Sequence, residues 1–187
     1  MAGPFLTTTA VVAIAEIGDK TQLLSLLLAA RFRKPWPILA GILAATVVNH
    51  LCAAAIGVWI EGLLEPNVLR WVLVASFAAM AVWTLIPDKL DEEEAGQSRR
   101  WGAFLTTLVM FFLAEIGDKT QLATTALAAR YDAIVAVTAA STLGLFLANA
   151  PVVFMGERLM KRLPLAAVRY VAAAAFAALA MAVILMG

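Results

Sequence analysis

Six apolar stretches occupy most of this chain, and each is long enough to cross the hydrocarbon core of a bilayer, about 30 Å thick, as an α-helix. They cover residues 5–30, 36–60, 69–86, 102–129, 133–155 and 168–186. Apolar residues make up 63% of the sequence and charged residues 14%, whereas soluble domains average about 45–50% and 25%. Most faces of these helices must therefore contact lipid or another helix. We predict an all-α integral membrane protein with six transmembrane helices.

The second half of the sequence repeats the first at a spacing of 99 residues, as Glu16 and Glu115 show. Residues 15–23 and 114–122 are identical at all nine positions. Each half carries three predicted spans, and because three is odd, the second half must enter the membrane from the opposite side. We predict one membrane domain of two inverted-topology three-helix repeats, residues 1–86 and 102–187, joined by a polar cytoplasmic linker at 87–101.

Basic residues gather on one side of the predicted membrane domain. Ten lie at the ends of the first, third and fifth spans: Arg31, Arg33, Lys34, Lys89, Arg99, Arg100, Arg158, Lys161, Arg162 and Arg169. Only Arg70 and Arg130 lie at the ends of the second and fourth spans. Because lysine and arginine are enriched in cytoplasmic loops, both termini are expected on the non-cytoplasmic side.

Each half carries the motif Glu-Ile-Gly-Asp-Lys-Thr within a predicted span, at residues 16–21 and 115–120. An ionisable side chain at the centre of a span costs about 2.5–3.5 kcal/mol, so it needs a partner, a bound ion or water. Glutamate and aspartate three residues apart project from nearly the same helix face. We predict that four carboxylates bind a metal ion near the middle of the membrane: Glu16, Asp19, Glu115 and Asp118.

Further polar residues are candidates for supporting this site: Lys20, Lys119, Gln22, Gln121, Thr21, Thr120, Asn49 and Asn149. Gly18 and Gly117 allow each span to break or another backbone to approach, and the threonines can satisfy carbonyls that a break leaves free. The asparagines either add neutral oxygen ligands or bond between helices. His50 has no histidine counterpart in the second half, and a proton-carrying role for it stays open.

The charges of the motif admit two interpretations. Lysine follows glutamate by four residues in each copy, so each motif could be a self-neutralising ion pair that locks helix packing. If the copies face each other instead, four carboxylates oppose two lysines, and the excess of two negative charges matches one divalent cation or two protons. Oxygen ligands without sulfur favour calcium, magnesium or manganese over zinc or copper. We expect no prosthetic group.

Several classes of function lack support in the sequence. A net charge of +1 argues against a nucleic-acid partner. The single cysteine, Cys52, excludes an internal disulfide and a thiolate metal cluster. The sequence contains no Walker loop and no His-Glu-x-x-His motif, so we expect neither an ATP-driven pump nor an enzyme.

With paired motifs at residues 16–21 and 115–120, the sequence resembles the calcium/manganese–proton exchanger family, which includes Golgi cation exchangers of eukaryotes and manganese exporters of bacteria. The resemblance covers essentially the whole chain, and neither motif departs from the family pattern. It implies two inverted three-helix repeats that move Mn²⁺ or Ca²⁺ out of the cytosol against protons or another cation. The chain lacks the N-terminal extension and long central loop of eukaryotic members, so it looks like a compact bacterial form. We then expect the protein to lie in the bacterial inner membrane and to export manganese.

Two other functions stay open at this point, an exporter of amino acids or other small solutes and a divalent cation channel. A membrane-embedded enzyme that uses paired carboxylates in acid–base chemistry is a third alternative, but the spans contain no recognisable nucleophile and no phosphate-binding arginine deep within them, which argues against it. Oxygen ligands alone do not separate Mn²⁺ from Ca²⁺, because selectivity also depends on cavity size and ligand number.

Overall fold

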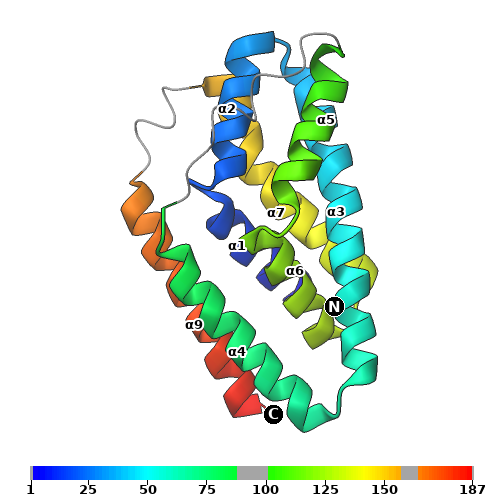
Figure 1. Ribbon diagram of the computed structural model, residues 1–187. Coiled ribbons are helices and arrows are strands. Elements are labelled where there is room, and N and C mark those ends of the chain that lie inside the picture. The colour runs from blue at the N-terminus through cyan, green and yellow to red at the C-terminus, as the bar shows by residue number, and fades with distance from the viewer. Residues whose placement is uncertain (1, 88–100, 157–163, 187) are drawn as a thin grey trace.

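The computed structural model describes residues 2–87, 101–156 and 164–186, and the regular elements in these ranges are all α-helices (Figure 1). They are α1 (Ala2–Glu16), α2 (Lys20–Phe32), α3 (Pro35–Leu63), α4 (Pro66–Thr84), α5 (Gly102–Glu115), α6 (Lys119–Tyr131), α7 (Ile134–Met155) and α9 (Leu165–Met186). The prediction of an all-α chain is confirmed for these residues. Six of the predicted cytoplasmic basic residues lie outside the described ranges: Lys89, Arg99, Arg100, Arg158, Lys161 and Arg162.

Four helices, α3, α4, α7 and α9, are long and apolar enough to cross a membrane. They match the second, third, fifth and sixth predicted spans. Both α3 and α4 begin with a proline in the first turn, where its missing N–H leaves no bond unmade. The shorter apolar helices α1 and α5 lie within the first and fourth predicted spans.

The first and fourth predicted spans are not continuous helices. Residues 17–19 separate α1 from α2, and residues 116–118 separate α5 from α6. Gly18 has a φ of +83° and Gly117 a φ of +74°, a backbone conformation that glycine adopts readily because it has no Cβ. Of the two roles expected for these glycines, the helix break is therefore the one observed.

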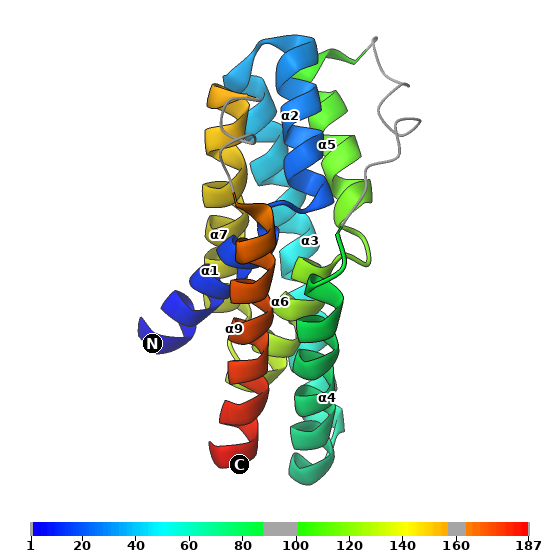
Figure 2. The same ribbon diagram turned by 90° about the vertical axis from the view of Figure 1, so that its left-hand side faces the viewer.

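The two halves of the chain interlock. α1 packs along α7 and α5 packs along α3, so the first helix of each half lies on the long central helix of the other. The last helices of the two halves, α4 and α9, pack side by side (Figures 1 and 2). Phe77 of α4 and Phe176 of α9, which the 99-residue spacing aligns, are completely buried in one apolar cluster. Each half is thus packed mainly by the other.

Crossing helices approach closely where one of them carries glycine. A Cβ on Gly144 of α7 would lie 2.7 Å from the carbonyl oxygen of Thr9 in α1, and a Cβ on Gly41 of α3 would lie 2.8 Å from that of Phe104 in α5. Small residues of this kind let helix backbones pack closely in membranes. These two crossings between the halves therefore have little room for a larger side chain.

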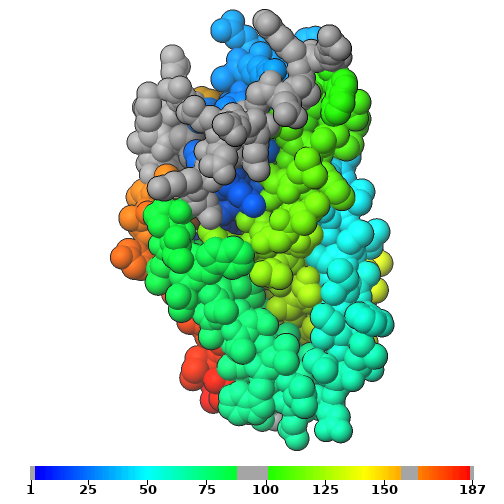
Figure 3. Space-filling model, in the orientation of Figure 1, coloured from blue at the N-terminus to red at the C-terminus, as the bar shows by residue number. Residues whose placement is uncertain are grey.

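Aromatic side chains mark the outer surface near the helix ends. Trp36, Trp59, Trp71 and Trp101 are 54–73% exposed, and each lies close to the end of a helix. Tryptophan concentrates at both membrane–water interfaces of helical membrane proteins. The side chains of α3, α4, α5 and α6 make up most of the coloured surface in Figure 3.

We predict that Gly144→Ala destabilises the protein and that Gly62→Ala does not. The new methyl group at residue 144 meets a backbone carbonyl that cannot turn away, whereas a Cβ on Gly62 of α3 meets nothing within 4 Å. Overpacking of this kind costs about 1–3 kcal/mol. Thermal unfolding of the detergent-solubilised variants measures the difference, and an unchanged melting temperature for Gly144→Ala would contradict close packing of α7 on α1.

Candidate cation site

The four predicted carboxylates lie at the two helix breaks, in the interior of the protein. Glu16 and Glu115 are the last residues of α1 and α5, and Asp19 and Asp118 directly precede α2 and α6. None of the four is more than 2% exposed, and both breaks lie near mid-height in Figures 1 and 2. Because the N-terminus of a helix carries a partial positive charge, both aspartates are placed where a buried carboxylate is electrostatically favoured.

Three of these carboxylates meet across the two halves. Glu16, Asp19 and Asp118 each offer an oxygen, and these oxygens lie within 4.8 Å of one another. Oxygens that bind one ion at 2.0–2.6 Å lie up to about 4–5 Å apart, so the three side chains can share one divalent cation. The Oε2 atom of Glu16 is buried and forms no hydrogen bond with the described residues, which leaves it available to an ion.

The fourth carboxylate, that of Glu115, lies outside this group of three and faces a histidine. Its Oε2 atom is 3.7 Å from Nε2 of His50 in α3, and both side chains are completely buried. The hydroxyl of Thr120 lies 3.3 Å from the same Oε2 atom and 3.2 Å from Oδ2 of Asp118. Because a hydroxyl has one proton to donate, it serves these two carboxylates alternately and connects Glu115 to the group of three.

The two motif lysines pair with aspartates of the opposite half. Nζ of Lys20 lies 3.6 Å from Oδ1 of Asp118, and Nζ of Lys119 lies 3.4 Å from Oδ1 of Asp19. Among the described residues, these crossed pairs replace the pairing of each lysine with the glutamate four residues before it. The interpretation of each motif as a self-neutralising pair is therefore wrong, because the helix break removes the geometry on which it depends.

Neutral side chains orient Glu16. The hydroxyl of Thr21 and the Nδ2 amide of Asn149 in α7 both donate to its Oε1 atom, the amide at 3.1 Å. The hydroxyl of Ser25 donates to Oδ1 of Asn149 at 2.6 Å and fixes the orientation of that amide. Thr21 and Thr120 thus bond to carboxylates and not, as the sequence suggests, to backbone carbonyls freed by the breaks.

Two glutamines stabilise the breaks. Oε1 of Gln22 accepts a hydrogen bond from the backbone N–H of Gly18 at 2.8 Å, and Oε1 of Gln121 accepts one from Gly117 at 2.7 Å. An N–H that loses its helical backbone acceptor can be satisfied by such a side-chain oxygen. The glutamines therefore hold the backbone in the shape that brings the carboxylates together.

His50 lies beside the candidate site, and the sequence gives it less weight than the structure does. Asn49 and Asn149 look like a repeated pair, but at the 99-residue spacing the counterpart of Asn149 is His50. The contacts agree with that register, since Asn149 bonds to Glu16 and His50 faces Glu115. Asn49 instead donates to a backbone carbonyl of α5 at 3.1 Å, which is an interhelical bond. Strict use of the repeat spacing would have identified the histidine.

A small void reaches the site at Asp19. It measures about 10 Å³ and is also lined by Gly18, Thr84, Lys119 and Arg169. This is room for about one water molecule, placed between the first helix break and the helices α4 and α9.

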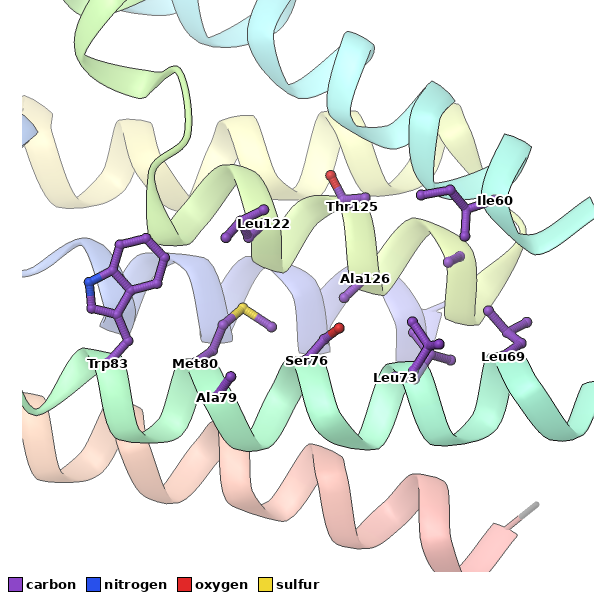
Figure 4. Close-up of a pocket in the computed structure, with 12 residues that line it drawn as sticks. Ile60, Leu69, Leu73, Ser76, Ala79, Met80, Trp83, Leu122, Thr125 and Ala126 are labelled. Carbon is purple, nitrogen blue, oxygen red and sulfur yellow. The ribbon is translucent and has the colours of Figure 1, made fainter. Parts of the chain in front are cut away.

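A larger cavity lies apart from the carboxylates. It measures about 280 Å³ and opens between α4 and α6 (Figure 4). Its lining is apolar except for Ser76 and Thr125, and Trp83 and Leu69 stand at its two ends. Because no carboxylate is among its lining residues, this cavity is not a candidate cation site.

Membrane-length helices that enclose carboxylates at paired helix breaks are typical of a helical membrane transporter of cations. Comparison with known proteins gives the same class. The chain belongs to the divalent cation/proton antiporter family GDT1, which it matches over residues 4–92 and 103–187. It is therefore a membrane protein of a divalent cation transporter family.

Bacterial and plant proteins are similar to this chain. A Vibrio cholerae protein named "Putative manganese exporter" is 54% identical over 172 residues, which cover 91% of this chain and 85% of that protein. GDT1-like protein 4 of Oryza sativa subsp. indica is 29% identical, over 75% of this chain and 58% of its own length. A GDT1-like protein of Synechocystis is 28% identical, over 65% of this chain and 68% of its own length. No solved structure matches the chain significantly.

We predict that Gly117→Ala weakens binding of a divalent cation roughly tenfold or more, whereas Gly102→Ala leaves it unchanged. Both glycines have a φ of +74° with nothing within 4 Å of a Cβ, so both substitutions carry the same backbone cost of about 1–2 kcal/mol. Only residue 117 lies between Glu115 and Asp118. Titration calorimetry with Mn²⁺ on the purified variants measures the affinity, and equal losses in both would show that the break does not position the carboxylates.

Proposed function

We propose that this protein exports a divalent cation from the cytosol in exchange for protons, with Mn²⁺ as the main cargo and Ca²⁺ as a second cargo. The observation that carries the proposal is the meeting of Glu16, Asp19 and Asp118, whose oxygens come from both helix breaks and lie within 4.8 Å of one another. Glu115 completes the set of four acidic residues at the edge of this group. An all-oxygen set of this kind suits Mn²⁺, Ca²⁺ and Mg²⁺.

In this proposal the membrane is crossed six times. α1 with α2, and α5 with α6, each form one crossing that is interrupted at mid-depth, and α3, α4, α7 and α9 form the other four. Interrupted helices of inverted repeats are a common way to place an ion site near the middle of a bilayer. The crossed contacts α1–α7 and α5–α3 support such a relation between the halves.

The orientation follows from the basic residues. Arg31, Arg33 and Lys34 lie in or beside the α2–α3 turn, at the opposite end of the molecule from the α3–α4 turn (Figures 1 and 2). The positive-inside rule makes the α2–α3 turn cytoplasmic. The C-terminus lies at the same end as the α3–α4 turn, so we propose that it faces away from the cytoplasm, together with the N-terminus.

Competition for the same carboxylates provides a mechanism of exchange. Four ionised carboxylates and two lysines leave a charge of −2, which one divalent cation or two protons neutralise. A cation that binds between Asp19 and Asp118 repels the ammonium groups of Lys119 and Lys20, which lie 3.4 and 3.6 Å from those aspartates. Binding therefore requires the lysines to move away, and their return, or protonation of the carboxylates, favours release.

The choice of cargo rests on two supports. The similar Vibrio cholerae protein carries manganese export in its name, and the family is one of divalent cation/proton antiporters. The family also favours a cation over an amino acid or other small solute, and transport over an enzymatic reaction. A divalent cation channel differs from the proposal in one measurable respect, because flux through a channel does not drive protons against their gradient.

We predict that purified protein in liposomes couples Mn²⁺ movement to opposite proton movement, and that Asp19→Asn and Asp118→Asn each reduce the rate at least about tenfold. Each substitution removes one ionised ligand, and Glu65→Gln serves as a control because Glu65 is exposed at the start of α4. A fluorescent metal indicator and a pH dye inside the liposomes report the two fluxes. Mn²⁺ flux without proton flux would indicate a channel, and full activity of both aspartate variants would remove the proposed site.

We predict that a reporter domain fused to the C-terminus lies outside the cytoplasm, whereas one inserted in the α2–α3 turn lies inside. An alkaline phosphatase fusion, which is active only outside the cytoplasm, distinguishes these positions. Activity of the fusion at the α2–α3 turn would reverse the proposed orientation.

A further inference from the structure

We propose that His50 is a ligand for the transported ion and that, with Glu115, it forms a second cation position beside the three-carboxylate group. This inference rests on the proposed function, and it assigns to one residue the preference for Mn²⁺ over Ca²⁺ and Mg²⁺. In this role, a ring nitrogen of His50 donates its electron pair to the metal ion.

The geometry permits an ion between the two side chains. His50 Nε2 and Glu115 Oε2 lie 3.7 Å apart, and neither side chain is exposed. Two atoms that bind one ion at about 2.1 Å from opposite sides are about 4.2 Å apart, so a separation of 3.7 Å suits two ligands at a wide angle. Water molecules and neighbouring oxygens supply the remaining ligands that an octahedral Mn²⁺ ion needs.

The polar atoms of this pair have few hydrogen-bond partners among the described residues. Both ring nitrogens of His50 are buried and form no hydrogen bond there, and the same holds for Oε1 of Glu115. Buried polar atoms are almost always hydrogen-bonded, and each exception needs an explanation such as an absent ion. A shared ion is one such explanation for two neighbouring side chains that each keep a buried electron-pair donor without a hydrogen bond.

The internal repeat provides a built-in comparison. Asn149, the counterpart of His50 at the 99-residue spacing, donates to Glu16 at 3.1 Å and accepts from Ser25 at 2.6 Å. Its amide is therefore occupied in orienting a carboxylate. A second asparagine at position 50 would have served Glu115 in the same way, whereas histidine adds a nitrogen that can bind metal.

The second position adjoins the first. The Thr120 hydroxyl lies 3.2 Å from Asp118 Oδ2 and 3.3 Å from Glu115 Oε2, so an ion leaving the three-carboxylate group toward Glu115 passes one hydroxyl. The first position offers only oxygen, which suits Mn²⁺, Ca²⁺ and Mg²⁺, whereas the second offers oxygen and nitrogen. Imidazole suits transition metals, while Ca²⁺ and Mg²⁺ take oxygen ligands. Passage through the second position therefore favours Mn²⁺.

The test compares wild-type protein with His50→Asn, which places the residue of the other half at this position. We expect His50→Asn to lower the ratio of Mn²⁺ to Ca²⁺ transport in liposomes at least about tenfold, chiefly through slower Mn²⁺ transport. Cys52→Ser is the matched control, since Cys52 is exposed and lies two residues further along α3. An unchanged ratio in folded His50→Asn protein would overturn the proposal, even if both rates fall together.

A second measurement needs no variant. Pulsed EPR of Mn²⁺ bound to the wild-type protein is expected to show modulation from a coordinated nitrogen, and oxygen-only coordination would overturn the proposal. This result differs from failure of the proposed function. If the proposed function fails, wild-type protein in liposomes does not exchange Mn²⁺ for protons, whatever the EPR spectrum shows. If His50→Asn does not fold, the wild-type spectrum still decides.

Discussion

Compensation of buried charge across the two halves is the constraint on which the structure depends. Asp19 and Asp118 are almost fully buried, and each has a lysine of the opposite half within 3.6 Å. Charged groups in such surroundings are stable only when they are paired. Neither half meets this requirement with the pairs described here, so the motifs bind the halves to each other as well as forming the candidate site.

The remainder of the fold serves this arrangement. The breaks at Gly18 and Gly117 turn carboxylates inward at the positive ends of α2 and α6, and glutamine side chains satisfy the backbone there. The close crossings at Gly41 and Gly144 bring the long helices of each half against the first helix of the other. The glycines at these crossings thus let the helices of the two halves approach closely enough for the motif aspartates and lysines to pair across the halves.

Much of this could be predicted from the sequence, because its strongest signals are local. Apolar length predicts α3, α4, α7 and α9, and the repeated motif predicts which residues lie at the site. The crossed pairing could not be predicted, since Glu16 and Lys20 look like neighbours on a continuous helix until Gly18 interrupts it. His50 is harder to predict, because Asn49 and Asn149 look like a repeated pair although the 99-residue spacing aligns Asn149 with His50.

The difference between Asn149 and His50 has a consequence for how such a chain can diverge. A dimer of identical three-helix units would present the same side chain to both glutamates, and any substitution would alter both sides together. Joining the units in one polypeptide removes that symmetry requirement. One half is then free to keep its glutamate firmly oriented while the other acquires a different neighbour, so a single gene can change the surroundings of one glutamate without altering those of the other.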